Sequence, residues 1–261
     1  MVYPDRMPAE LFNDLTDVYE AMIDWPKRLA HEEPFYRRLF ERVGVRSVAD
    51  VACGTGRHAA MFHSWQLRVE GSDISPAMIE RARGHFGEPP GLRWVVRAFD
   101  APDHPADGAR PTEPFDAAIC VGNSLALAPD KPTAGRAIGQ MLAAVRPGGA
   151  IVVHVLNLWH LPDGPCVWQK SKRTTLPQGE MLILKGVHRC GPRGYVDLIV
   201  TGPSGGKPLC SESVPLLGLE AADLEEMARR AGAAQVAFSG GYQDQRYQPQ
   251  KSVDLVMVAE K

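Results

Sequence analysis

An acid and a pair of glycines lie where an expected strand is followed by a helix, and a second acid ends the next expected strand. Asp50 lies inside the apolar stretch 47–53, and Gly54 and Gly56 follow it. Glycine lets the backbone turn sharply and a ligand approach closely. The free N–H groups of the next helix attract an anionic or electron-rich group. Asp73 ends the next expected strand, where a carboxylate can accept two ribose hydroxyls, so the pattern predicts a nucleoside ligand.

The glycine turn alone leaves the ligand class open. A phosphate-binding loop would need Lys and Ser or Thr after the last glycine, but Arg57 and His58 follow here. A dinucleotide turn, G-x-G-x-x-G or A, fits Gly54 and Gly56 with Ala59 in the third place. Dinucleotide and methyl-donor proteins both use an acid after the second strand, so this acid does not choose between them.

Short apolar runs alternate with amphipathic segments through the middle of the chain. Strands are expected at 47–53, 67–73, 92–99, 115–121 and 149–156, and helices at 57–64, 75–86 and about 133–146. This alternation predicts a parallel sheet with helices on both faces. Such a doubly wound α/β sheet binds its ligand beyond the carboxyl ends of its strands.

The 261 residues suit one α/β domain, 1–261, with four parts. These parts are a helical lid over 1–45, a cofactor-binding core over 46–156, a small antiparallel insert over 157–219, and a closing helix and hairpin over 220–261. Three insert strands are expected, at 181–189, 195–202 and 211–219. The last two strands, 235–241 and 252–260, are expected to pair antiparallel, because the loop between them is too short for a crossover helix.

Composition narrows the partners and the location. The formal net charge is −2 without a basic stripe, which argues against nucleic-acid binding. No apolar run reaches the roughly 20 residues of a membrane span, and the start is too polar for a signal peptide. Five cysteines without paired spacing indicate reduced thiols and a cytoplasmic protein. No metal site is expected, because the histidines lack ligands at suitable spacing.

The stretches DVACGTG (50–56) and VEGSDISPAMIERAR (69–83) resemble the class I S-adenosylmethionine-dependent methyltransferases. The resemblance runs from about Tyr19 to Lys261. It implies a Rossmann-like seven-stranded sheet whose last strand is antiparallel, and S-adenosylmethionine as cofactor. The reversed hairpin and Asp50 speak against the rival reading as a nicotinamide oxidoreductase.

The resemblance also implies which residues hold the methionine end of the cofactor. Ala52 and Gly54 should line it, and the carbonyl of Val121 should accept from its ammonium. Arg28 should pair with its carboxylate, the alternative being a solvated helix charge. Tyr19 should face the sulfonium, since aromatic faces attract cations; the alternative is ordinary core packing.

The nucleoside end is assigned in the same way. The resemblance places Asp73 on the ribose and Ile74 against the adenine. Asp100 should lie near the adenine amino group, with Phe99 beside it.

The run FDAAICVGNSLALAPD (115–130) resembles the glycine and sarcosine N-methyltransferases within that class, which implies that Asn123 faces the methyl group and the acceptor. One departure matters. Those enzymes have an arginine just past the fifth strand, where this chain has Leu156. Lys170, Lys172 and Arg173 could replace it only by folding back. This argues against glycine and for an acceptor that is larger or less acidic.

The expected activity is methyl transfer from S-adenosylmethionine to a small-molecule acceptor, most simply at an amine nitrogen. Alternatives are a small-molecule O-methyltransferase and a non-catalytic cofactor-binding protein. Tyr19, Asn123 and His154 are the substrate-side candidates. His154 could act as a base because its ordinary pKa lies near neutrality; the alternative is a buried structural histidine. The insert should either cap the active site or join two copies in a homodimer.

Overall fold

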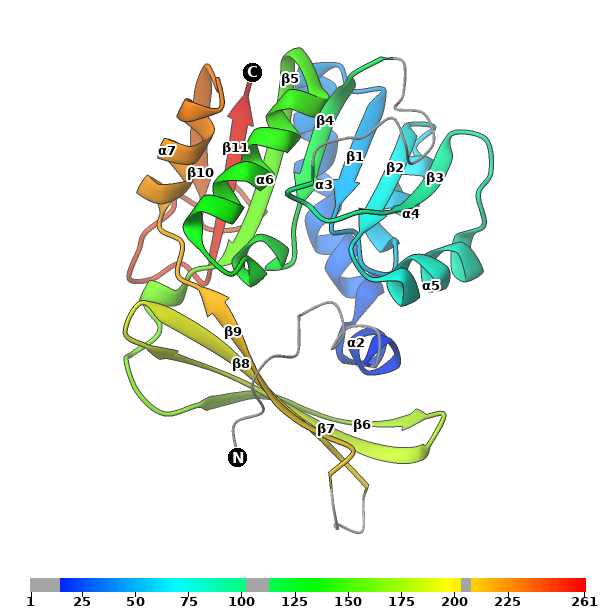
Figure 1. The fold of residues 1–261 in the computed structure, drawn as a ribbon, viewed down its shortest axis with the longest axis vertical. Coiled ribbons are helices and arrows are strands. Elements are labelled where there is room, and N and C mark those ends of the chain that lie inside the picture. The colour runs from blue at the N-terminus through cyan, green and yellow to red at the C-terminus, as the bar shows by residue number, and fades with distance from the viewer. Residues whose placement is uncertain (1–14, 102–112, 203–207) are drawn as a thin grey trace.

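The computed structural model describes residues 15–101, 113–202 and 208–261, and in these ranges the chain forms two separate sheets (Figure 1). The larger sheet has seven strands in the order β10-β11-β5-β4-β1-β2-β3. Its strands are β1 Ser47–Val51, β2 Arg68–Asp73, β3 Leu92–Val96, β4 Phe115–Cys120, β5 Val145–Leu156, β10 Gln235–Ser239 and β11 Asp254–Glu260. β11 runs antiparallel to both β10 and β5, and the other neighbours are parallel. The predicted doubly wound sheet with its reversed hairpin is confirmed.

Helices cover both faces of this sheet, so most residues of its central strands are buried. The helices are α3 Trp25–Val43, α4 Arg57–Ser64, α5 Pro76–Phe86, α6 Lys131–Ala144 and α7 Ala221–Arg230, with short 3-10 turns at Ser124–Leu127 and Leu158–His160. Figure 1 shows α6 and α7 in front of the sheet and α3 behind it. Every residue of β4 is buried, as expected for a parallel strand covered on both sides.

Side-chain caps fix where two of these helices begin. Ser75 accepts a hydrogen bond from the Met78 N–H at 3.2 Å, and Pro76 occupies the first turn. Asp130 accepts from the Thr133 N–H at 2.8 Å in the same way before α6. Such caps satisfy N–H groups that the helix itself leaves free, and they place both helix starts directly beyond the carboxyl ends of β2 and β4.

The insert is an antiparallel sheet of four strands, where the sequence predicted three. The strands are β6 Val167–Leu176, β7 Gly179–Cys190, β8 Arg193–Thr201 and β9 Cys210–Leu217, in that order across the sheet. The missing strand in the prediction is β6. It is an edge strand with nearly all side chains exposed, so its sequence lacks the apolar alternation by which a strand is identified.

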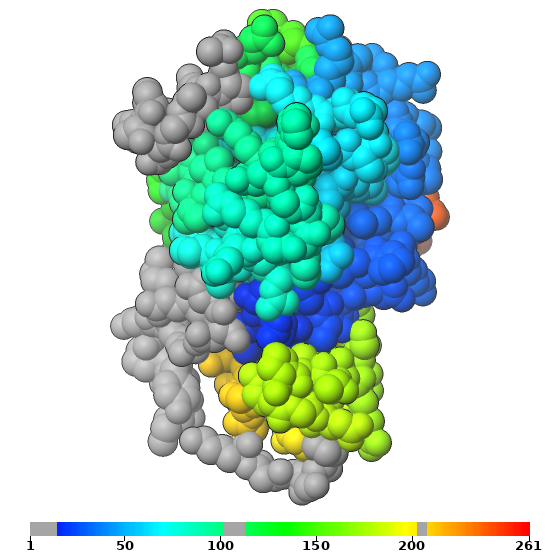
Figure 2. Space-filling view, turned by 90° about the vertical axis from the view of Figure 1, so that its right-hand side faces the viewer, coloured from blue at the N-terminus to red at the C-terminus, as the bar shows by residue number. Residues whose placement is uncertain are grey.

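The helix α2, Thr16–Met22, lies between the two sheets. Val18 packs against the inner face of the insert, in a cluster with Leu176, Ile183, Leu198, Val200 and Cys210. On its other side α2 contacts α5, and Figure 2 shows the dark-blue helix held between the cyan part of the large sheet and the yellow-green insert. We call α2 the lid helix; residues 1–14 of the predicted lid lie outside the described residues. Among the described helices, none combines the length and apolar character needed to cross a membrane.

Candidate functional site

The glycine turn lies at the carboxyl end of β1 and uses backbone angles that favour glycine. Gly54 and Gly56 have φ of 56° and 80°, and Ala52 also has a positive φ of 55°. A side chain at Gly56 would place its Cβ 2.4 Å from a ring carbon of Trp94. Only glycine fits there without moving the ring, so the turn is packed closely against β3.

Asp73 and Asp50 stabilise this turn by accepting hydrogen bonds from backbone N–H groups. Asp73 accepts from the N–H of Gly54 and from the N–H of Ser75, both at 2.9 Å, and Asp50 accepts from the Ala59 N–H at 3.1 Å. Burial raises the pKa of Asp73, although these N–H groups lower it in part. Burial also raises the pKa of Asp50 to about 6, against the lowering effect of His58 and the Ala59 N–H.

The other residues assigned to the nucleoside lie at the neighbouring strand ends. Ile74 is an apolar side chain left 47% exposed beside Asp73, which leaves a flat apolar surface at the sheet edge. Phe99 is half-buried against the core. Asp100 pairs with Arg136 at 3.1 Å, so one side of its carboxylate faces α6.

A cavity of about 630 Å³ opens between the lid helix, α3, the turn after β4 and the inner face of the insert. It is lined by Tyr19, Met22, Ile23, Asp24, Lys27, Arg28, His31, Gly122, Asn123, Leu127, Lys170, Lys185, Val196, Leu198, Val214 and Leu216. The cavity thus brings together three of the predicted site residues, Tyr19, Arg28 and Asn123. The insert caps this cavity, which was one of the two roles predicted for it.

Two glycines allow the lid and α3 to approach the strand ends. A Cβ on Gly54 would lie 3.4 Å from the Tyr19 hydroxyl, and a Cβ on Gly122 would lie 3.2 Å from the Arg28 guanidinium. Asn123 follows with a φ of 78°, and its side-chain oxygen accepts from the N–H of Leu156. The Val121 carbonyl accepts from the Ser124 hydroxyl at 3.0 Å.

A buried ionic chain that the sequence analysis missed holds Arg28 in place. One Glu32 oxygen accepts from Arg28 at 2.8 Å, and the other contacts His58 at 2.7 Å. Burial alone would raise the pKa of Glu32, but the His58 hydrogen bond and charge, followed by Arg28, lower it to about 2. The Arg28–Glu32 spacing of four residues is a detectable helix pair, whereas the contact with α4 has no local signal.

His154 is placed differently from the predicted base. Its Nδ1 accepts from the Gly122 N–H at 3.2 Å, and its Nε2 lies 3.1 Å from an Asp254 carboxylate oxygen. Because Nδ1 accepts, the ring proton resides on Nε2 and is donated to Asp254. Both nitrogens are therefore engaged within the protein, and His154 is not among the residues that line the cavity. This arrangement favours the structural alternative.

One cluster among the described residues has atoms that could ligate a metal, although no metal site was expected. Cys166, His188 and Asp197 bring one ligand atom each within 4.8 Å of one another. Asp197 pairs with His188 at 2.7 Å and accepts from the Ser213 hydroxyl at 2.8 Å. These hydrogen bonds account for the cluster without an ion. It lies on the outer face of the insert, because the neighbours of Asp197 along β8 face the cavity.

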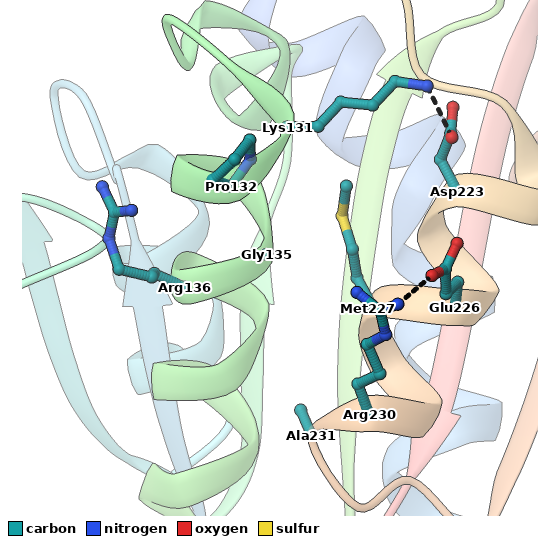
Figure 3. Close-up of a pocket in the computed structure, with 9 residues that line it drawn as sticks. All are labelled: Lys131, Pro132, Gly135, Arg136, Asp223, Glu226, Met227, Arg230 and Ala231. Carbon is teal, nitrogen blue, oxygen red and sulfur yellow. Dashed lines mark hydrogen bonds and ion pairs between the residues drawn. The ribbon is translucent and has the colours of Figure 1, made fainter.

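A second cavity, of about 570 Å³, lies between α6 and α7 (Figure 3). Four of its charged side chains pair with each other, Lys131 with Asp223 and Arg230 with Glu226, each at 2.6 Å. The fifth, Arg136, pairs with Asp100 at 3.1 Å. None of the predicted site residues lines it. The geometry therefore points to the first cavity as the candidate site.

Comparison with known proteins agrees with this geometry. A family model described as a methyltransferase domain matches residues 48–149. A glycine/sarcosine N-methyltransferase of Parasynechococcus marenigrum is 31% identical over 174 residues, which cover 64% of this chain and 58% of that protein. A dTDP-4-amino-2,3,4,6-tetradeoxy-D-glucose N,N-dimethyltransferase of Saccharopolyspora spinosa is 31% identical over 156 residues, which cover 58% of this chain and 56% of that protein. The chain thus spans a little more than half the length of these curated relatives.

Solved structures share the fold over nearly the whole chain. The CcbJ methyltransferase from Streptomyces caelestis superposes with a TM-score of 0.73 at 20% identity, covering 95% of this chain and 97% of that one. CalS10, an amino pentose methyltransferase from Micromonospora echinaspora, gives a TM-score of 0.68 at 20% identity, covering 99% and 100%. At this identity the likeness shows the fold. Residues 48–149 thus match a methyltransferase domain, and nearly the whole chain shares the fold of these methyltransferase structures.

Proposed function

We propose that this protein transfers a methyl group from S-adenosylmethionine to an amine nitrogen of a small molecule. The observation that carries the proposal is the cavity that ends on Tyr19, Arg28 and Asn123, directly beside the glycine turn. Curated relatives that methylate amines support nitrogen over oxygen as the target. The cavity provides room for an acceptor beyond the cofactor site.

The residues at the strand ends fit the cofactor. Asp73 uses two oxygens for two N–H groups within the turn, and each carboxylate oxygen has a further lone pair for a ribose hydroxyl. Ile74 offers apolar surface to an adenine, and Phe99 and Asp100 are the other residues assigned to the adenine. Ala52 and Gly54 would lie along the methionine part of the cofactor. Its ammonium would donate a hydrogen bond to the Val121 carbonyl, and its carboxylate would pair with Arg28. When bound, S-adenosylmethionine supplies the methyl group on a good leaving group.

The remaining chemistry is alignment, which can supply up to roughly 7–11 kcal/mol of a barrier. The Asn123 oxygen is occupied by the Leu156 N–H, so the amide NH₂ is the group left to donate to an acceptor. Burial raises the pKa of Tyr19 well above its ordinary value, so its side chain is a neutral phenol. Tyr19 lines the cavity in this form. With His154 engaged within the protein, the amine proton passes to water.

Calorimetry and a transfer assay test the proposal together. S-adenosylmethionine and S-adenosylhomocysteine should bind and NAD should not, and labelled methyl groups should appear on nitrogen in a metabolite pool. Binding of NAD alone would overturn the proposed cofactor. Tight cofactor binding without any labelled product would favour the non-catalytic alternative, and label on oxygen would favour an O-methyltransferase.

We also propose that residues 1–261 act as one methyltransferase domain in the cytoplasm. No disulfide joins any of the five cysteines, all of which lie within the described residues, in keeping with a reducing compartment. A homodimer is proposed through the exposed edge strand β6 of the insert, where Val167 and Trp168 are about half exposed. Light scattering on the purified protein tests the dimer, and a monomeric mass would rule it out.

A further inference from the structure

The cavity wall carries an excess of positive charge. Among the described residues that line it, five are basic and Asp24 is the only acid. These basic residues are Lys27, Arg28, His31, Lys170 and Lys185. Asp24 is engaged in capping α3, where it accepts from the Lys27 N–H at 3.2 Å, and Arg28 is neutralised by Glu32. The ammonium groups of Lys27, Lys170 and Lys185 therefore have no carboxylate partner within the described residues, and Lys170 and Lys185 lie together on the insert.

Lys170 and Lys185 face each other across the insert. They are register partners on β6 and β7, and both line the cavity. Within the described residues, no hydrogen bond or ion pair joins either ammonium to a carboxylate. Like charges directly opposite on neighbouring strands are unfavourable, and burial, followed by the charges of Lys170 and Arg28, lowers the pKa of Lys185. An anion between the two ammonium groups would relieve this repulsion.

The insert folds β6 back toward the lid helix. Lys172, two residues beyond Lys170 on β6, reaches the carbonyl of Ala21 in the lid helix at 2.7 Å. The inner face of β6 is thus folded back over the cavity, which the sequence could not establish. The apolar side chains Leu127, Val196, Leu198, Val214 and Leu216 also line the cavity. This combination fits a molecule with an apolar body and a charged end.

We propose that the acceptor is an amine that also carries an anionic group, a carboxylate or a phosphate, and that Lys170 and Lys185 bind that group. The inference rests on the proposed methyl transfer and names its substrate class. It replaces the expectation of a less acidic acceptor, while the expectation of an acceptor larger than glycine agrees with a cavity of about 630 Å³. Lysine ammonium groups act as point charges, so the two anions share the same recognition chemistry.

The test is a labelled-methyl transfer from S-adenosylmethionine into a metabolite pool, with the products separated on an anion exchanger and identified by mass spectrometry. We expect the labelled product to carry a carboxylate or a phosphate, and its mass distinguishes the two. With the purified acceptor, Lys185→Gln and Lys170→Gln should each raise KM roughly tenfold or more, with a smaller change in kcat and unchanged affinity for S-adenosylhomocysteine.

Two further variants keep the test independent of folding. Lys185→Arg retains the charge and should restore most of the lost affinity. Arg173→Gln removes one charge from the exposed part of the same strand and should leave KM unchanged. A labelled product without an anionic group, or equal KM values for Lys185→Gln and Arg173→Gln, would overturn the anion site while leaving methyl transfer standing. The absence of any labelled product would overturn the proposed function and this inference with it.

Discussion

At the scale of single residues, buried carboxylates organise the ends of the parallel strands. Asp73, Asp50 and Glu32 are all nearly inaccessible to solvent, and each accepts from groups that shape the site. Buried charge is costly unless it is paired and hydrogen-bonded, so these acids fix their partners firmly. The glycine turn and Arg28 are held in position by this pairing before any ligand arrives.

Asp73→Asn tests the role of the carboxylate at the end of β2. The substitution keeps the shape of the side chain but removes its charge and one acceptor. We expect S-adenosylhomocysteine to bind roughly tenfold or more weakly, since a hydrogen bond to a charged group contributes about 1.5–3 kcal/mol. Calorimetry measures this. Asp244→Asn, at an exposed pair with Arg38, is the matched control and should bind normally; equal affinities in the two variants would contradict the assignment.

Glu32→Gln tests the ionic chain through pH. The folded pKa of Glu32 is about 2, below its ordinary value of 4.5. A carboxylate with a lowered pKa stabilises the fold fully above its unfolded pKa, and this contribution is lost as the pH falls toward 2. We expect the variant to lose about 2–3 kcal/mol in the free energy of unfolding at pH 7, and the difference from wild type to shrink below pH 4.5.

Urea unfolding at pH 7, 4.5 and 3 measures this difference. Glu33→Gln is the control, because the Glu33–Arg37 pair is exposed and exposed pairs contribute little. A difference between Glu32→Gln and wild type that stays constant across this pH range would show that the carboxylate charge is not what stabilises the chain.

At the scale of elements, the parallel core was predictable and the insert was only partly so. The strands β1, β3 and β4 are short, mostly apolar runs bounded by turn residues, and such runs can be recognised locally in the sequence. The exposed edge strand β6 carries no such signal, since its formation depends on backbone pairing with β7. The cavity wall could not be predicted for the same reason, because Lys170 reaches the cavity only through the pairing of β6 with β7.

The lid helix is an element whose position depends on few contacts. Val18, 3% exposed, is its buried anchor on the insert. Val18→Ala should cost about 1–2 kcal/mol of local stability, which corresponds to roughly 5- to 30-fold faster exchange of the α2 amides. Hydrogen exchange detected by mass spectrometry measures it. Val167→Ala, at an exposed position of the same insert, should leave these amides unchanged, and equal exchange in both variants would refute this anchoring.

At the scale of the whole molecule, the site forms where three separately packed bodies meet. One core cluster lies under α6 and α7 and a second under α3 and α4, and the lid helix forms a third with the insert. The contact between Glu32 and His58 joins α3 to α4 across 26 residues of sequence. Periodicity and motif spacing do not encode such contacts, because they arise only when the helices pack against each other. The strand ends could therefore be predicted, whereas the cavity between the lid helix and the insert could not.

This division predicts graded protection against hydrogen exchange. The central strands β4 and β5 are buried on both faces, whereas the insert presents one face to solvent and ends on the lid helix. The base of the insert, at Val187 and Leu216, packs into the first core cluster, and its far end packs with α2 in the described part of the chain. We expect amides of β4 and β5 to exchange slowest, those near Val187 faster, and those near Val200 faster still, because local opening exposes less buried surface near Val200 than in the core.

Native-state exchange in low denaturant resolves these steps. Equal protection of Val200 and the centre of β4 would mean that the insert and the core unfold as one unit, and the cavity between them would then open only on global unfolding.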